Sequence, residues 1–230
     1  MIDWTYIILV LPAIIFSMIA SSRVTRTFDK YSTQLSMRRI TGAQAARAVL
    51  NANGLSAVAV ERVAGKLSDH FDPSANVVRL SESVFGSTST AAIGVACHEV
   101  GHAIQHAVGY APVKLRTAIV PITNFGAKLS TPLIIGGLLL ASFAPTLIWL
   151  AYAGIACFAL CTVFQLVTLP TEFNASRRAL ESMQSCGVLY DSEVDSARKV
   201  LRAAAMTYVA ALAVSFMQLL RFILIVRRRR

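Results

Sequence analysis

Charged side chains are scarce in this chain. Asp, Glu, Lys and Arg together account for 15% of its 230 residues, and residues 129–169 contain none of them. Soluble proteins are about one quarter charged. Because 55% of the residues are also hydrophobic, the composition excludes an ordinary soluble domain and indicates a membrane protein with one modest polar domain.

Acidic residues are the rarer charged groups, with 12 Asp and Glu against 22 Lys and Arg. The basic residues are scattered and no nucleic-acid-binding motif accompanies them, so we expect no nucleic-acid partner. In a membrane protein, such an excess usually marks the loops that stay in the cytoplasm. The four cysteines form no CxxC pair, and two of them lie in an apolar run, which favours reduced thiols over a disulfide framework.

Three long apolar segments are candidates for membrane spans. Residues 4–20 carry no charge and match the about 17–25 residues of one span. Asp3 stands where a cleaved signal peptide would carry basic residues, so we expect a retained anchor. A helix over residues 129–169 would be roughly twice the ~30 Å of a hydrocarbon core. These residues are therefore expected to form two spans that turn at Ala144–Pro145, and such a hairpin returns the chain to the side that it left.

The last apolar segment, residues 207–226, is interrupted by Arg221 and followed by four arginines. The positive-inside rule assigns the basic segments 21–118 and 171–206 to the cytoplasm, whereas four complete spans would put the arginine tail outside. Either this segment does not cross the membrane fully, or the larger basic segments determine the orientation of the protein and the arginine tail lies outside.

The polar region contains two capped helix signals. In TGAQAARAVLNANG, Thr41 is placed as an N-cap, Gln44 occupies the capping-box position and Gly54 follows the end. A second helix is expected from residues 87–90, which offer N-caps, to about Val108. Between the helices, residues 57–65 and 76–83 have β-branched alternation on either side of a turn-rich stretch, which predicts a β-hairpin. The second of these strands could act as an exposed edge that an extended substrate joins by backbone hydrogen bonds.

The second helix contains HEVGH, a match to H-E-x-x-H. On a helix, His98 and His102 lie about 40° apart on one face, so both imidazoles can reach the same metal ion. Imidazole suits Zn²⁺, and a catalytic zinc has three protein ligands plus water. Glu99 projects beside the metal, where it can accept a proton from the activated water and pass it to the leaving amine. A chance match is the alternative, but these polar groups would be costly to bury without a partner.

The stretch does not supply an obvious third ligand. His106 is four residues beyond His102, but the three histidines would extend over ~12 Å of helix, too far for one ion with bonds of ~2.1 Å. We expect His106 to support a ligand or to lie in the core. Glu172, in LPTEFNASRRALE, is predicted at the start of a helix on the same side of the membrane as His98, and it is the better candidate. His70, a loop residue between two aspartates, competes weakly.

The stretch NVVRLSESVFGSTSTAAIGVACHEVGHAIQHA, followed by TLPTEFNASRRALE, resembles the YugP-type family of membrane zinc metallopeptidases, also called neutral zinc metallopeptidases. The resemblance covers nearly the whole chain. It implies zinc ligands at His98, His102 and Glu172, with Glu99 as the catalytic residue.

The wider arrangement of motifs is similar to the HtpX-type and CAAX-prenyl-protease group. That group has E-x-x-A-D where this chain has EFNAS, so Ser176 replaces an Asp that would orient a zinc-bound histidine. Asn174 and Asp195 are the candidates for that orienting role.

The chain is thus predicted to be a mainly α integral membrane protein with about four transmembrane helices and a small α+β, zincin-like metallopeptidase domain. We expect a zinc-dependent endopeptidase with one Zn²⁺ per chain, embedded in the bilayer of a bacterial plasma membrane, with its active site facing the cytoplasm. Its partners are peptide or protein substrates, with membrane proteins among the candidates. The predicted parts are an anchor (1–22), the catalytic domain (23–117), a membrane hairpin (118–170), a helical segment that supplies the third ligand (171–206) and a last transmembrane segment with the basic tail (207–230).

Two other functions remain open. A site-2-type intramembrane metalloprotease has its HExxH within a span, which the apolar run Ala91–Val108 permits. Its third ligand is an Asp in a later span, however, and residues 129–169 and 207–226 contain no Asp. A non-catalytic metal-binding membrane scaffold would have no use for Glu99. No sequence pattern indicates the substrate, its cleavage specificity or the oligomeric state.

Overall fold

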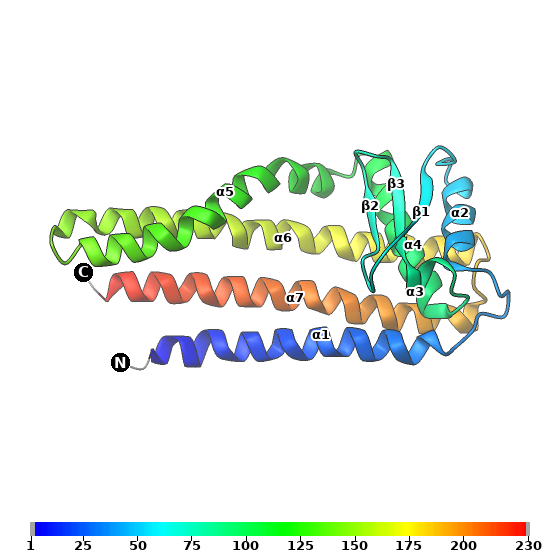
Figure 1. Ribbon diagram of the computed structural model, residues 1–230, viewed down its shortest axis with the longest axis horizontal. Helices are drawn as coiled ribbons and strands as arrows, with labels where there is room; N and C mark the ends of the chain where they lie inside the picture. Colours follow the sequence, from blue (N-terminus) through cyan, green and yellow to red (C-terminus); the bar gives the residue numbers. More distant parts are fainter. Residues whose placement is uncertain (1–2, 229–230) are drawn as a thin grey trace. The chain divides into compact units, whose positions relative to one another are not determined.

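The computed structural model describes residues 3–228 and is mainly helical (Figure 1). A π-helical turn, η1 (Tyr6–Val10), leads directly into α1. The remaining elements, in chain order, are α1 (Leu11–Ser32), α2 (Gly42–Ala52), β1 (Ala59–Val63), β2 (His70–Asp72), β3 (Val77–Ser81), α3 (Glu82–Phe85), α4 (Thr90–Ala107), α5 (Ala111–Leu140), the 3₁₀ turn η2 (Pro145–Leu147), α6 (Ile148–Ser185) and α7 (Asp191–Arg227).

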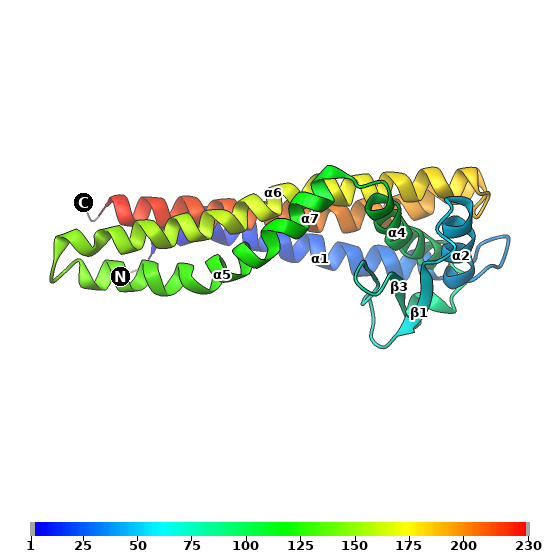
Figure 2. The ribbon, with the colours of Figure 1, turned by 90° about the horizontal axis from the view of Figure 1, so that it is seen from above.

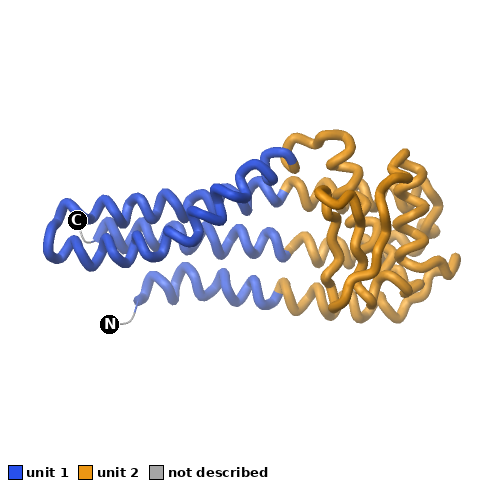
Figure 3. Tube along the Cα trace, turned by 45° about the horizontal axis from the view of Figure 1, so that its top comes forward, with its two compact units in different colours: residues 1–19, 114–169, 207–230 blue, residues 20–113, 170–206 orange. Residues whose placement is uncertain are grey.

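Within residues 3–228, four helical segments are long and apolar enough to cross a membrane: Tyr6–Ser32, Ala111–Leu140, Pro145–Ser185 and Asp191–Arg227. Together with one small three-stranded sheet, they confirm the predicted class, a mainly α membrane protein with a small α+β part. The chain divides into two compact units (Figure 3). Unit 1 comprises Met1–Ile19, Lys114–Leu169 and Thr207–Arg230, and unit 2 comprises Ala20–Val113 and Pro170–Met206.

In unit 1, the turn predicted at Ala144–Pro145 is confirmed, because α5 ends at Leu140 and η2 begins at Pro145. The two helices on either side of this turn pack closely at glycines. A Cβ placed on Gly154 would lie 2.7 Å from the carbonyl oxygen of Ser130, so only glycine permits this approach.

The C-terminal end of α7 contains the one charged residue of the last apolar segment, Arg221, and the helix continues through it. The guanidinium donates to Oδ2 of Asp3, at 3.0 Å from Nε and 2.6 Å from Nη2. Hydrogen bonds from Thr5 and Arg221 lower the pKa of Asp3 to about 2, so this carboxylate stays ionised and pairs with the arginine. The end of α7 thus lies beside the start of the first apolar helix.

In unit 2, α2 has the caps that the sequence predicts. The Thr41 hydroxyl accepts a hydrogen bond from Gln44 N at 3.2 Å, and the Gln44 side chain accepts one from Thr41 N at 2.8 Å. Gly54 then adopts a φ of +72°, a conformation in which a side chain would be strained, and ends the helix.

The predicted pairing of residues 57–65 with 76–83 as a β-hairpin is wrong. β1 pairs with β3 in parallel, with Ala59 opposite Val77, and β2 joins the other side of β3 in antiparallel orientation. The order of strands in the sheet is therefore β1-β3-β2. The stretch that was predicted to be a turn contains an additional strand, β2. β3 is the central strand and is buried on both faces, so it is not the exposed edge that the sequence suggested.

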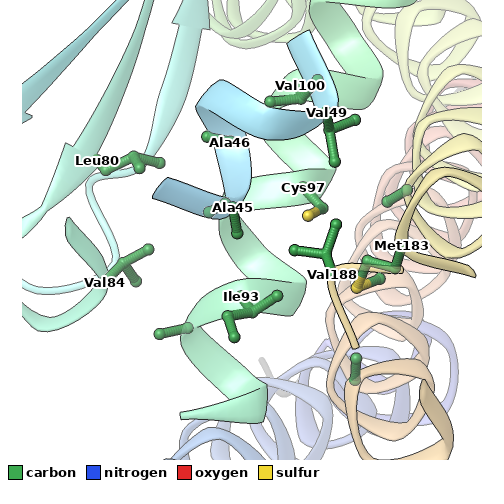
Figure 4. Close-up of a cluster of buried hydrophobic side chains, with 14 of the residues drawn as sticks. Ala45, Ala46, Val49, Leu80, Val84, Ile93, Cys97, Val100, Met183 and Val188 are labelled. Atoms are coloured by element: carbon green, nitrogen blue, oxygen red, sulfur yellow. The ribbon is translucent and has the colours of Figure 1, made fainter. Parts of the chain in front are cut away.

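The core of unit 2 is built around α4 (Figure 4). Ile93, Cys97 and Val100 of α4 are fully buried, and α2 lies alongside them (Figures 1 and 2). Met183 from α6 and Val188 close the core from another side. This packing holds α4 between neighbouring helices and fixes the direction in which its polar residues point.

The helix predicted to begin at Glu172 instead continues from the membrane hairpin. α6 runs without a break from Ile148 to Ser185, and Pro170 lies inside it. Proline removes one backbone donor, and a neighbouring polar group can compensate for that loss in an apolar helix. The carbonyl affected is that of Leu166, four residues before the proline, and the helix continues on both sides of it.

Candidate metal centre

The helix α4 presents the HEVGH residues from a rigid position. Its start is capped by Ser89, whose side chain accepts from Ala92 N at 3.2 Å. Its end is followed by Gly109 with a φ of +63°. The predicted helix is therefore confirmed, with His98 and Glu99 at its middle and His102 one turn further on.

Gly101, within HEVGH, is the point at which α6 comes closest to α4. A Cβ placed on it would lie 2.5 Å from the carbonyl oxygen and 3.1 Å from the carbonyl carbon of Ala175. Such an approach is possible only where the residue has no side chain. The contact brings the segment of α6 around Glu172 against the histidine face of α4.

His98, His102 and Glu172 form one group. Their ligand atoms all lie within 4.8 Å of one another. Oε2 of Glu172 is 3.3 Å from Nε2 of His98 and 3.4 Å from Nε2 of His102. A tetrahedral zinc ion with bonds of ~2.1 Å separates its ligand atoms by about 3.4 Å. Two imidazoles and one carboxylate are also a donor set that catalytic zinc uses, so these residues fit the ion in both chemistry and spacing.

The other nitrogen of each histidine ring has a partner of its own. Nδ1 of His102 donates to Oε1 of Gln105 at 3.0 Å, and Nδ1 of His98 lies 3.2 Å from the hydroxyl of Ser176. A proton held on Nδ1 leaves the lone pair of Nε2 directed at the other ligands, which is the tautomer that binds a metal. Both partners are neutral.

Gln105 connects the histidine to α6. It is fully buried, and its amide nitrogen donates to the carbonyl of Thr171 at 2.8 Å and to Oδ1 of Asn174 at 2.9 Å. Nε of Arg178 donates to the same Asn174 oxygen at 2.8 Å. Every hydrogen-bonding atom of the Gln105 amide group therefore faces a partner in the site, and the network ties His102 to the helix that carries Glu172.

These contacts revise what the sequence suggested about orienting residues. Gln105 was missed, although a glutamine three residues after His102 on an apolar helix face is a recognisable signal. Ser176 occupies the orienting position itself. Asn174 contributes indirectly, through Gln105. Asp195 does not take part, because it is exposed and pairs with Arg198 at 2.6 Å.

Glu99 lies next to this group and is 8% exposed. Within residues 3–228, no hydrogen-bond donor or ion-pair partner engages its carboxylate. Its charge nevertheless acts on His102. A carboxylate so placed can exchange a proton with water or substrate.

The surroundings of His102 favour positive charge. Burial lowers the pKa of this imidazole, but the hydrogen bond to Glu172 and the charges of Glu99 and Glu172 outweigh burial, so the net pKa is raised. An environment that stabilises a cation at the ring is what a metal ion also requires.

The two remaining histidines lie outside the group. His106 is exposed and packs against the ring of Phe71 at 5.9 Å between centroids, so it is neither a core residue nor a support for a ligand. His70 is exposed on β2, and its Nδ1 lies 2.8 Å from the carbonyl of Ser68.

Comparison with known proteins gives a class that agrees with this geometry. Residues 6–227 match the family described as "Putative neutral zinc metallopeptidase". The chain belongs to this family of zinc peptidases, and its four apolar helices make it a membrane member.

The chain is similar to the "Putative membrane protease YugP" of Bacillus subtilis (strain 168). The two are 46% identical over 220 residues, which cover 96% of each chain. No solved structure gives a significant match.

Proposed function

We propose that this protein is a membrane-bound, zinc-dependent endopeptidase. The observation that carries the proposal is the convergence of His98, His102 and Glu172, whose ligand atoms lie within 4.8 Å of one another beside Glu99. Membership of a zinc peptidase family and the membrane-protease name of the relative support the same activity.

In this proposal one zinc ion is held by Nε2 of His98, Nε2 of His102 and a carboxylate oxygen of Glu172. When bound, the ion supplies a Lewis acid that polarises the scissile carbonyl and acidifies water. The chain then provides the proton transfers. Glu99 takes a proton from the attacking water and later delivers it to the nitrogen of the leaving amine, so one carboxylate serves as base and then as acid.

The neutral partners of the histidines have a defined part in this scheme. Gln105 and Ser176 keep the Nδ1 protons in place, so the two rings cannot rotate or change tautomer while Glu99 gains and loses its proton. Gln105 and Ser176 are uncharged and do not take up or release protons in this scheme. The proton that moves is therefore the one on Glu99, which is not a ligand of the zinc ion.

Peptide binding is proposed at the outer edge of β2. This strand pairs with β3 on one side only, and its Phe71 contacts His106 near the end of α4. In the described part of the chain, no other strand pairs with its outer edge. An extended substrate could therefore add to the sheet by backbone hydrogen bonds, next to the helix that carries the catalytic groups.

The proposed location is a bacterial plasma membrane, with the site on the cytoplasmic face. Two basic segments, 21–118 and 171–206, support this orientation through the positive-inside rule. They contribute the residues of unit 2, which contains the candidate site.

The proposal is tested with purified protein in detergent, incubated with casein and with membrane-protein substrates, with and without a zinc chelator. Glu99→Gln is expected to retain one zinc per chain and lose cleavage, because the amide cannot take up the proton. Glu172→Ala is expected to lose zinc as well as cleavage. Cleavage by Glu99→Gln at the unaltered rate would refute the catalytic role, and a full zinc content in Glu172→Ala would refute the ligand.

The two alternatives predict different results. The intramembrane protease requires its HExxH helix in a span, but α4 is absent from the four candidate spans found in the described residues, and most of its residues are buried against the rest of unit 2. The scaffold predicts that Glu99→Gln changes neither zinc content nor any hydrolytic activity.

A further inference from the structure

A second feature of unit 2, separate from the metal centre, is a basic cleft between α1 and α7. It has a volume of about 510 Å³. Arg23 and Lys30 line it from α1, and Lys199 and Arg202 line it from α7. Thr27 and Tyr31 also belong to its wall.

The cleft residues repeat with helical spacing on both helices. Positions 23, 27, 30 and 31 share one face of α1, and positions 199, 202, 203 and 206 share one face of α7. Two stripes that each carry two cations therefore face the same space. Such an arrangement concentrates positive charge, and like charges repel unless an anion lies between them.

No carboxylate neutralises this charge. The cleft wall contains no Asp or Glu, and in residues 3–228 none of the four cations has an ion-pair partner. The two nearest acidic residues in the sequence are already engaged, since Asp29 pairs with Lys66 at 3.0 Å and Asp195 pairs with Arg198 at 2.6 Å.

Tyr31 positions two of the cations. The ammonium of Lys30 lies 5.5 Å from the centre of its ring, and the ammonium of Lys199 lies 5.9 Å from it. Cation–π attraction of this kind holds both ammonium groups at the wall of the cleft. Arginine and lysine donors, together with the hydroxyl of Thr27, form the set that binds phosphate oxygens.

The place of these residues in the chain indicates the source of the phosphate. Arg23 follows the apolar segment 4–20 by three residues, and Met206 immediately precedes the apolar segment 207–226. The cleft is thus formed where two membrane helices leave their apolar stretches, which is the depth of lipid headgroups. Basic pockets between helices on the cytoplasmic side bind anionic headgroups.

We infer that this cleft binds the phosphate group of an anionic phospholipid, which anchors α1 to α7 at the membrane surface. The four cations contact the phosphate oxygens, and the lipid acts as a structural ligand of unit 2. This site is independent of the metal centre and of the proposed peptidase activity.

The test uses the full-length protein in nanodiscs of phosphatidylcholine, or of phosphatidylcholine mixed with phosphatidylglycerol. Phosphatidylglycerol retained by the protein is counted by native mass spectrometry, and its affinity is measured by titration with a short-chain form in detergent. The variant Lys199→Gln/Arg202→Gln removes two cleft cations. Because a cation near an anionic surface contributes about fivefold in affinity, the double variant is expected to bind about 25-fold more weakly.

The control is Arg26→Gln/Arg198→Gln, which removes the same charge from exposed positions outside the cleft wall on the same two helices. It is expected to bind the lipid like the original protein. Equal weakening in both double variants, or unchanged affinity in the cleft variant, would overturn the proposal.

Inorganic phosphate forms a separate arm of the experiment. It is expected to compete weakly, since it lacks the diester and acyl chains of the lipid. If inorganic phosphate binds as tightly as phosphatidylglycerol, and phosphatidylglycerol has no advantage over phosphatidylcholine, the assignment to a lipid is wrong. The thermal unfolding of each variant in phosphatidylcholine alone distinguishes a lost site from a misfolded chain.

Discussion

Gly101→Ala is expected to weaken zinc binding at the candidate metal centre without altering any ligand. The added Cβ would lie 2.5 Å from the carbonyl oxygen of Ala175, whereas ordinary contacts begin at 3.4 Å. The obstacle is backbone, so no side chain can rotate away. The helices α4 and α6 must then separate by roughly 1 Å, at a cost of about 1–3 kcal/mol.

That displacement is large for a metal site. Zinc–ligand distances are held to within about 0.2 Å, and Glu172 lies on the displaced segment of α6. We therefore expect zinc affinity to fall at least by the about 10- to 100-fold that follows the loss of an outer hydrogen-bond partner. The assay is a competition between the protein and a chromophoric chelator, with the zinc content measured independently by mass spectrometry.

Two glycine variants serve as controls. Gly94→Ala, on the same helix, brings its Cβ to 3.1 Å from the side chain of Ala197 in α7 and leaves α6 alone, so it is expected to reduce stability while zinc binding persists. Gly136→Ala, in α5, meets no atom within 4 Å and should change neither property. If Gly101→Ala folds and binds zinc as tightly as the original chain, the close approach of these two backbones does not position Glu172.

Three further outcomes follow from contacts in unit 2. Gln105→Leu should weaken zinc binding by about 10- to 100-fold, because Nδ1 of His102 loses its acceptor, and an unchanged titration curve would contradict this role. Met183→Ala should lower the free energy of unfolding by about 2–5 kcal/mol in denaturant titrations, because the Met183 side chain is 0% exposed. As a control, Met37→Ala at a 69% exposed position should change this free energy by no more than about 0.5 kcal/mol. Burial raises the pKa of the Cys97 thiol, so this cysteine should resist alkylation in the folded protein and react only after unfolding. Peptide mass spectrometry measures the alkylation, and rapid labelling of the folded chain would be inconsistent with the buried position.

The features that could be predicted from the sequence are those with local signals. The caps of α2 and α4 depend on residues three or four positions apart, and both helices form where Thr41 and Ser89 indicate. The pairing of His98 with His102 follows from helical spacing alone. Glu172 could be predicted as a ligand only from the family resemblance and from the two spans of the hairpin. Its approach to α4 depends on the contact between Gly101 and Ala175, which sequence spacing does not reveal.

The features that were predicted wrongly depend on distant partners. Residues 57–65 and 76–83 have the alternation of paired strands, but alternation does not say whether a pair is parallel, and β2 is only three residues long. A helix start was predicted at Glu172, yet α6 runs through this residue and through Pro170, because one lost backbone hydrogen bond is tolerated in an apolar helix. The signal for Gln105 was present, since a buried amide must find partners, but its partners lie on another helix.

The separation of Glu172 from the two histidines has a consequence for biosynthesis. Some seventy residues, including α5 and the apolar part of α6, are translated between His102 and Glu172. A nascent chain therefore carries a complete HEVGH helix for as long as the hairpin takes to be made and inserted, but lacks the carboxylate that completes the proposed zinc site. With the proposed ligand set, the zinc site is complete only once Glu172 has been translated, so we expect zinc-dependent proteolysis to begin after the hairpin has been made.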